Sequence, residues 1–198
     1  MPLHLFFALV LFASVMAFTP GPNNVLLAAS GVNFGFMRTM PHILGVTVGF
    51  DVLLIAGAIG VGLLFAAIPQ LQLVLKIAGA AYMLYLAWRV ATAHQGGGEG
   101  EARARPFTFL QAAAFQWINP KAWFAVIGGV ALYVRPGYEW IDFPLMLAVM
   151  TVVTLGAVAL WTGFGVALRQ FLRDPARARI FNISMALLLV VSIVPMVL

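Results

Sequence analysis

An all-helical integral membrane protein is the fold class that the sequence predicts, and three features predict it. Hydrophobic residues make up 63% of the 198 residues, charged residues only 9%, and the mean hydropathy of +1.03 far exceeds that of a soluble domain. Several apolar runs are longer than the roughly 20 residues that an α-helix needs to cross a bilayer core. None of them alternates polar and apolar residues as a membrane barrel strand does. We therefore expect residues 1–198 to form a single transmembrane domain.

The charge balance indicates membrane topology and argues against a nucleic-acid partner. The formal charge is +5, but the basic residues stand singly in short connections and form no patch interleaved with aromatic residues. The chain has no cysteine, which excludes disulfides, thiolate metal sites and cysteine nucleophiles. We expect no metal and no cofactor. The first residues lack the basic region of a cleavable signal, so the first helix is expected to stay in the protein.

Six apolar segments follow one another along the chain. They cover residues 3–34, 41–67, 69–93, 107–132, 143–168 and 179–197. A glycine-rich, charged and therefore flexible aqueous loop at 93–106 separates two halves, about 1–92 and 107–198, with three segments each. A unit with an odd number of spans crosses the membrane in the opposite sense when it is repeated. The pattern therefore predicts two inverted three-helix repeats, which are common in secondary transporters.

The arginines predict the orientation of the bundle. With six spans, the first, third and fifth connections lie on one side, and the other side carries only Arg135 and, at most, Lys76. Eight basic residues lie on the first side: Arg38, Arg89, Arg103, Arg105, Arg169, Arg173, Arg177 and Arg179. By the positive-inside rule this side is cytoplasmic, so both chain termini are expected outside.

The first apolar segment is interrupted near its middle by the motif TPGPNN at residues 19–24. An unbroken helix over 3–34 would be about 48 Å long, too long for one upright span. Pro20 removes a backbone donor and clashes with the preceding turn, whereas Pro22 is suited to begin a new helix. Gly21 supplies conformational freedom between them. A helix break near the membrane midplane is therefore expected.

A matching break is expected in the second half, where INPKAW occupies residues 118–123. Pro120 lies one hundred residues after Pro20 and is again near the centre of its apolar segment. Asn119 is a favourable N-cap for a helix that restarts at Pro120. The first helix of each repeat is thus predicted to be broken at a proline motif.

Breaking a helix in hydrocarbon frees carbonyls on the incoming half and amide hydrogens on the outgoing half, and each needs a partner. A zwitterionic amino acid suits such a place, because its carboxylate fits the positive helix N-terminus and its ammonium fits the freed carbonyls. Asn23, Asn24 and Asn119 add donors and acceptors. The alternative is that each proline is a packing kink whose freed groups meet a neighbouring helix. The matching positions, each with asparagine, favour one shared substrate site.

Three ionisable residues are expected at membrane depth. Asp51 and Lys121 lie about 15 Å and about 21 Å from the cytoplasmic face, and Lys76 about 10 Å from the outer face. Charges at such depth mark an ion pathway or a proton relay unless they are paired. Asp51 with Lys76 or Lys121 is the predicted proton-coupling group or ion pair. The alternatives are that Lys76 extends to the outer headgroups and that the pair is only structural.

Three stretches resemble the LysE/RhtB family of amino-acid exporters: FTPGPNNVLLAASGVNFGFMRTMPHILGVTVGF, LKIAGAAYMLYLAWR and FQWINPKAW. Together they extend the likeness over nearly the whole chain, and TPGPN followed by NPK about one hundred residues later is a specific combination. TPGPNN is most similar to the branch that exports cysteine and O-acetylserine.

The resemblance implies a six-helix exporter of the bacterial inner membrane, driven by the proton-motive force as an antiporter, with amino acids or their derivatives as substrates. Carried over position by position, it implies that the motif residues bind substrate: Pro20, Gly21, Pro22 and Asn23 in the first break, and Asn119, Pro120 and Lys121 in the second. Asp51 does not follow the family pattern, in which an acid directly after Gly49 is expected. The interpretation of Asp51 therefore rests on its depth alone.

Two other function classes were compared with export. A membrane-embedded hydrolase or lipid-modifying transferase needs a nucleophile with a base, or paired acids, at one depth. No intramembrane serine has a histidine at its level, so the chain is predicted not to be an enzyme. A passive channel would not need two matching broken helices. The sequence leaves open the exported amino acid, the coupling stoichiometry and a possible homo-oligomer in the bilayer.

Overall fold

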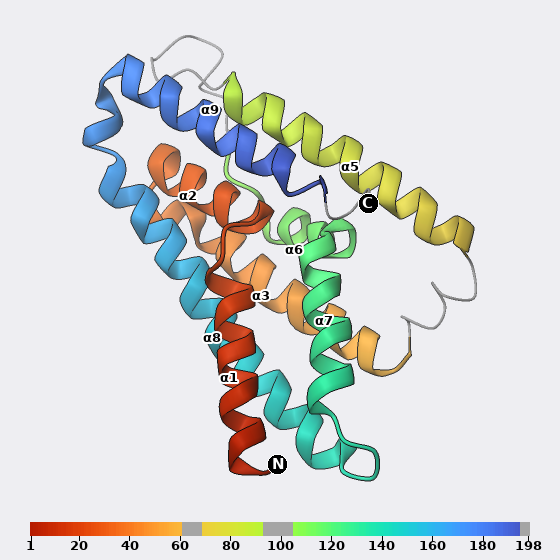
Figure 1. Ribbon diagram of the computed structural model, residues 1–198. Coiled ribbons are helices and arrows are strands. Elements are labelled where there is room, and N and C mark those ends of the chain that lie inside the picture. Colours follow the sequence, from red (N-terminus) through yellow and green to blue (C-terminus); the bar gives the residue numbers. More distant parts are fainter. Residues whose placement is uncertain (61–68, 93–104, 195–198) are drawn as a thin grey trace.

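The computed structural model describes residues 1–60, 69–92 and 105–194, and all regular structure within these ranges is helical (Figure 1). The helices, with the labels of Figure 1, are α1 (Leu3–Phe18), α2 (Pro22–Phe34), α3 (Phe36–Ala58), α5 (Pro69–Ala91), α6 (Phe109–Ile118), α7 (Pro120–Tyr133), α8 (Glu139–Leu168) and α9 (Pro175–Val191), with a short 3-10 turn η2 at Phe171–Arg173. The predicted helical fold class is confirmed for the part of the chain that is described. The predicted loop at 93–106 lies almost wholly outside it.

Two helices, α3 and α8, are each long and apolar enough to cross a membrane. The pair α1 and α2 passes the same test as one span that is bent by 55°. Successive helices run in alternating directions: α1, α5 and α8 lead away from the end where the N-terminus lies, and α3, α7 and α9 lead back toward it (Figure 1). A multi-pass membrane bundle follows from these features, and the count of six spans stays a prediction.

Several helices begin earlier than the apolar pattern indicated. Gly35, at φ 80°, ends α2 and directly precedes α3, so Arg38 lies within the first turns of α3. Helix α9 begins at Pro175, where the Asp174 carboxylate accepts hydrogen bonds from the backbone N–H groups of Ala176 and Arg177. Polar residues are compatible with a helix once it leaves the hydrocarbon core. Apolar segments therefore mark the spans and miss the helix ends.

Glycines bring two pairs of helices into backbone contact. A Cβ at Gly31 of α2 would overlap the Thr162 carbonyl of α8, and a Cβ at Gly165 would overlap the backbone of α2. Gly45 and Gly49 of α3 contact the backbone of α6 in the same way. Small residues four apart permit such close approach in membranes, where packing and not water expulsion drives helix association. These glycines are therefore packing positions.

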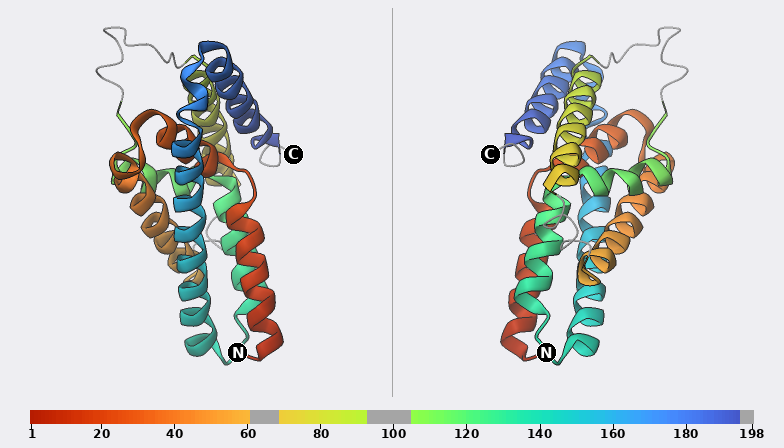
Figure 2. Two further views of the ribbon diagram at one scale, coloured as in Figure 1. Left: turned by 90° about the vertical axis from the view of Figure 1, so that its left-hand side faces the viewer. Right: turned by 90° about the vertical axis from the view of Figure 1, so that its right-hand side faces the viewer.

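The long helix of each half packs along the broken helix of the other half. α8 lies along α1 and α2, α3 lies along α6 and α7, and α5 packs on α9. Figure 2 shows α1, α7 and α8 side by side toward the N-terminal end, while α6 crosses them at the opposite end of α7. Both breaks therefore lie within the bundle, between α3 and α8.

Candidate functional site

The first break has the position that TPGPNN predicts. α1 ends at Phe18, α2 begins at Pro22, and Thr19 and Gly21 between them have extended backbones. In the second break, Asn119 is also extended and stands between the last residue of α6 and the first of α7. Its side-chain oxygen accepts a hydrogen bond of 3.1 Å from the backbone N–H of Lys121, which is the predicted cap.

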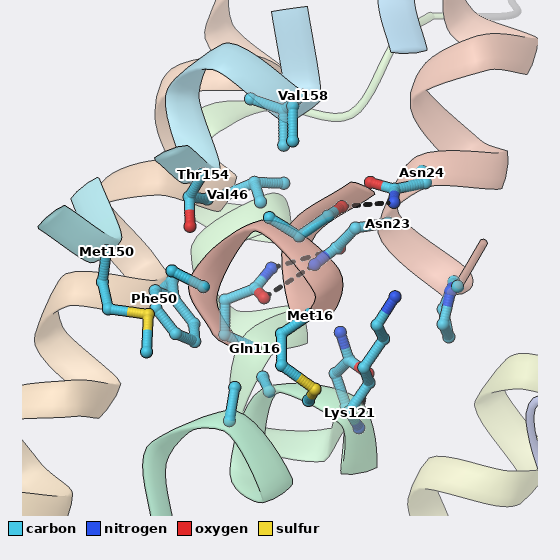
Figure 3. Close-up of a pocket in the computed structure, with 18 residues that line it drawn as sticks. Met16, Asn23, Asn24, Val46, Phe50, Gln116, Lys121, Met150, Thr154 and Val158 are labelled. Atoms are coloured by element: carbon cyan, nitrogen blue, oxygen red, sulfur yellow. Dashed lines mark hydrogen bonds between the residues drawn. The ribbon is translucent and has the colours of Figure 1, made fainter. Parts of the chain in front are cut away.

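A cavity of about 60 Å³ lies where the two breaks meet, with further walls from α1, α3, α6 and α8 (Figure 3). About 10 to 15 Å³ of such space suffices for one water molecule, so the cavity has room for a few waters or for the head group of one amino acid. The predicted site residues that line it are Gly21, Pro22, Asn23, Asn24, Asn119 and Lys121. Pro20 and Pro120 are not among its lining residues.

The carbonyl end of α1 is met by donors from the protein itself. One amide group, Asn24 Nδ2, lies 2.8 Å from the carbonyl oxygens of both Ala17 and Thr19. The Lys121 ammonium donates to the Thr19 carbonyl at 2.5 Å, to the Thr19 hydroxyl at 2.8 Å and to the Pro20 carbonyl at 3.3 Å. From the sequence, we expected these carbonyls to bind the ammonium group of the substrate. In the structure, Asn24 and Lys121 occupy them.

The N-terminus of α2, in contrast, has no cap. Gly21 has no side chain, Pro22 has no N–H, and the first satisfied amide of the helix is that of Val25, which donates to the Gly21 carbonyl at 3.0 Å. Within the described ranges, the backbone N–H groups of Asn23 and Asn24 have no hydrogen-bond partner. Two free amide hydrogens therefore stand at the positive end of the α2 dipole.

Lys121 lies beside this uncapped N-terminus. A Cβ built on Gly21 would be 2.8 Å from Lys121 Cδ and 3.1 Å from Nζ, so the lysine stem packs directly on the glycine. A larger residue at this position would force the lysine stem to shift. The ammonium and the α2 dipole thus present positive charge to the same side of the cavity, and anions bind readily at such helix ends.

A buried glutamine that the sequence analysis did not single out joins the two halves. Gln116, on the last turns of α6 and fully buried, accepts a hydrogen bond of 2.8 Å from Asn23 Nδ2. Its own amide nitrogen donates to Asn23 Oδ1 at 3.2 Å and to the Ala112 carbonyl at 2.8 Å. Figure 3 shows the two side chains facing each other in the cavity wall. A polar residue one turn before the INPKAW break was the signal that could have revealed it.

Asp51 lies partly buried on α3, just outside the cavity. Its Oδ1 accepts a hydrogen bond of 2.9 Å from the Thr151 hydroxyl on α8. The preceding residue on each helix, Phe50 and Met150, lines the cavity. No ion pair joins Asp51 to Lys121 in the described part of the chain, and the side chain of Lys76 lies outside what the structure describes. The structure therefore brings Asp51 together with a hydroxyl, and Lys121 with the α1 carbonyls.

A second acid is buried at the other end of α8. Asp142 accepts hydrogen bonds from Arg135 Nε at 2.7 Å, from Nη2 at 3.0 Å and from the Arg135 backbone at 3.2 Å. Tyr133, nearby on α7, donates from its hydroxyl to the Ala8 carbonyl of α1 at 3.2 Å. Sequence analysis counted Arg135 only as a loop charge. These contacts hold α1, α7 and α8 together far from the cavity.

Comparison with known proteins places the chain among transporters. The family described as LysE type translocator matches residues 14–194. The chain is 31% identical over 179 residues to the Cysteine/O-acetylserine efflux proteins of Escherichia coli strain K12 and of Shigella sonnei, with 89% of each chain covered. It is 30% identical over the same length to the protein of that name in Escherichia coli O139:H28. No solved structure matches.

Proposed function

This chain belongs to the LysE type translocator family, and on that premise we propose how it exports amino acids or their derivatives. Proteins of this family are multi-pass transporters of the cytoplasmic membrane, which favours export over the membrane-enzyme alternative. We propose that the substrate binds in the cavity between the two helix breaks. The observation that carries this proposal is the uncapped N-terminus of α2 beside the Lys121 ammonium.

The substrate carboxylate would bind at this N-terminus. The free N–H groups of Asn23 and Asn24 supply donors for its oxygens, and the Lys121 ammonium supplies one more by giving up its long bond of 3.3 Å to the Pro20 carbonyl. Hydrogen bonds to an ionised group are about twice as strong as neutral ones. α7 offers no equivalent place, because Asn119 already caps it. The two breaks thus have different roles: the second supplies Lys121, and the first receives the carboxylate.

The substrate ammonium needs an acceptor other than the α1 carbonyls, which already have donors. Thr154 of α8 lines the cavity, and within the described residues its hydroxyl makes no hydrogen bond. We propose that Thr154 accepts a hydrogen bond from the ammonium. Gln116 is fully bonded and would act by holding Asn23.

Small substrates fit the remaining walls best. Met16, Val46, Phe50, Met150 and Val158 supply an apolar lining beside the polar groups. A short side chain with a thiol or an acetyl group suits such a lining better than a charged one, because a buried charge needs a partner. The similar efflux proteins carry cysteine and O-acetylserine in their names. We propose these two compounds as substrates.

Six spans in two inverted repeats, about 1–92 and 107–198, remain our proposal for the architecture. It is supported by the alternating helix directions. It is also supported by the packing of the long helix of each half, α3 or α8, along the broken helix of the other half. An arginine-rich cytoplasmic side and both termini outside complete it. Alternating access would then come from one repeat rocking against the other around the cavity, with protons as the coupling ion and Asp51 as their carrier.

Transport into everted membrane vesicles tests the proposal. Vesicles that contain the protein should accumulate labelled O-acetylserine when their interior is made acidic, and those with Lys121→Met should not. Vesicles without the protein are the background control. If no amino acid in a broad panel accumulates above this background, export is refuted. If accumulation survives an uncoupler, only the proton coupling is refuted.

A further inference from the structure

The Thr151 hydroxyl lies between two oxygen acceptors. Its Oγ1 is 2.9 Å from Asp51 Oδ1 and 2.7 Å from the carbonyl oxygen of Leu147. A hydroxyl has one hydrogen to donate and two lone pairs that accept. While the Asp51 oxygen only accepts, the single hydroxyl hydrogen is shared between the two acceptors. When Asp51 carries a proton, it can instead donate to Thr151, which leaves the hydroxyl hydrogen to the Leu147 carbonyl. The two contacts therefore permit a different hydrogen-bond pattern in each protonation state of Asp51.

Loss of that proton changes which bonds can form. When the carboxyl O–H bond breaks and the proton passes to water, the ionised carboxylate can only accept. The single hydrogen of Thr151 then shifts from the Leu147 carbonyl toward Asp51, where it forms a charge-assisted bond. The contact between α3 and α8 is thus different in the two protonation states.

The contact between Asp51 and Thr151 lies next to two residues of the cavity wall. Phe50 and Met150, which precede Asp51 and Thr151, both line the cavity, and Thr154 follows one turn later on α8. A change in how α3 and α8 meet at this level moves two of the cavity walls relative to each other. Through the Thr151 hydroxyl, protonation of Asp51 can therefore change the relative position of the cavity walls that α3 and α8 form.

Other ionisable groups near α3 do not contact Asp51. The helices packed against α3 are α2, α6, α7 and α8. α2 and α6 carry no ionisable side chain; those on α3 itself, α7 and α8 are Arg38, His42, Lys121, Tyr133, Glu139 and Asp142. None of these six forms a hydrogen bond or ion pair with Asp51. Thr151 is the partner of Asp51 in the described part of the chain.

We propose that Thr151 is a positioning residue for proton coupling, which links the protonation state of Asp51 to the packing of α3 against α8. This inference rests on the proposed proton-coupled export. It assigns to Thr151 no contact with the substrate. Substrate exchange at equal concentrations, which needs no net proton movement, should therefore survive the loss of the hydroxyl, while accumulation driven by a pH gradient should not.

Four proteins in reconstituted vesicles test it: wild type, Thr151→Val, Thr151→Ser and Thr162→Val. Valine keeps the shape of threonine without the hydroxyl, and serine keeps the hydroxyl. Thr162 is the control, because it is another threonine of α8 and its hydroxyl donates only to the Val158 carbonyl of its own helix. Counterflow exchange and gradient-driven accumulation of labelled O-acetylserine are measured for each.

We expect Thr151→Val to keep exchange within about twofold of wild type and to lose at least about fivefold in accumulation, with Thr151→Ser and Thr162→Val close to wild type. Unchanged accumulation in Thr151→Val overturns the inference, as does equal loss of exchange and accumulation or a failure of serine to restore coupling. If Thr151→Val does not fold, Thr151→Ala is measured with and without Asp51→Asn. Because Thr151 acts through Asp51, adding Thr151→Ala to Asp51→Asn should lower neither exchange nor accumulation any further, and a further loss on that addition overturns the inference. Absence of gradient-driven accumulation in wild type instead refutes the proposed proton coupling itself.

Discussion

Replacing Lys121 with methionine removes the ammonium and keeps a stem of similar length. In the structure, this ammonium donates to three oxygens of the α1 end, those of the Thr19 carbonyl, the Thr19 hydroxyl and the Pro20 carbonyl. Asn24 still holds the Thr19 carbonyl in the variant. The Pro20 carbonyl and the Thr19 hydroxyl oxygen lose their donor, but the hydroxyl still donates to the Val15 carbonyl, so the helix break is expected to persist.

The substrate carboxylate would lose one charged hydrogen bond. Such a bond contributes about 1.5 to 3 kcal/mol, and 1.4 kcal/mol corresponds to a factor of ten in affinity. Lys121→Met should therefore weaken substrate binding by about 10- to 100-fold. Lys121→Arg should also bind less well, because the planar guanidinium is wider than the ammonium and the stem packs on Gly21.

Affinity is measured by competition of unlabelled compounds with labelled O-acetylserine during exchange in reconstituted vesicles. Trp161→Phe is the matched control, since it removes another donor to the α1 end, the 3.3 Å bond to the Phe18 carbonyl, without removing a charge. A substrate analogue without a carboxylate, such as cysteamine, should compete equally with wild type and Lys121→Met. An affinity of Lys121→Met for O-acetylserine within twofold of wild type would refute the proposed carboxylate site.

Three further predictions concern the pair of Asn23 and Gln116, the N-terminus of α2 and the orientation of the bundle. Asn23→Ala leaves the buried Gln116 amide without its partner, Gln116→Ala leaves the partly buried Asn23 amide without its partner, and each should cost about 1 to 3 kcal/mol in unfolding free energy. The double variant should cost about 1 kcal/mol or more less than the sum of both, and additive losses would contradict the pair. Gly21→Ser offers the α2 amides a hydroxyl cap and its Cβ displaces the Lys121 stem, so it should weaken substrate binding more than about tenfold; unchanged affinity would mean that those amides are not used. Since the chain has no cysteine, Tyr138→Cys should react with an impermeant maleimide on intact cells and Arg173→Cys only after permeabilisation, and the reverse pattern would invert the orientation.

Local chemistry explains which features the sequence could predict. Pro20, Pro22 and Pro120 act on their own backbone, so the helix breaks follow from residue type, and Asn119 caps the helix in which it stands. Helix ends were less predictable, because hydropathy reports the hydrocarbon core and a helix can continue into water.

Partners distant in sequence could not be predicted in the same way. Asn23 and Gln116 are 93 residues apart, and Asp51 and Thr151 are 100 apart, so each contact depends on how α3, α6 and α8 pack. Sequence reasoning looked for a lysine beside Asp51, because opposite charges at membrane depth usually pair. The packing brings a hydroxyl instead, and the described lysine, Lys121, binds helix carbonyls.

The contrast between the two breaks explains why repeated motifs can form one site instead of two. Both motifs place a proline at the start of the second half-helix, but the residue before it is Gly21 in one and Asn119 in the other. Asparagine satisfies the amides of its own helix, whereas glycine leaves those of α2 free and leaves room for Lys121. Positive charge from both halves therefore gathers at one helix end. A single amino acid bound there would contact both repeats at once, so that movement of one repeat against the other acts directly on the substrate.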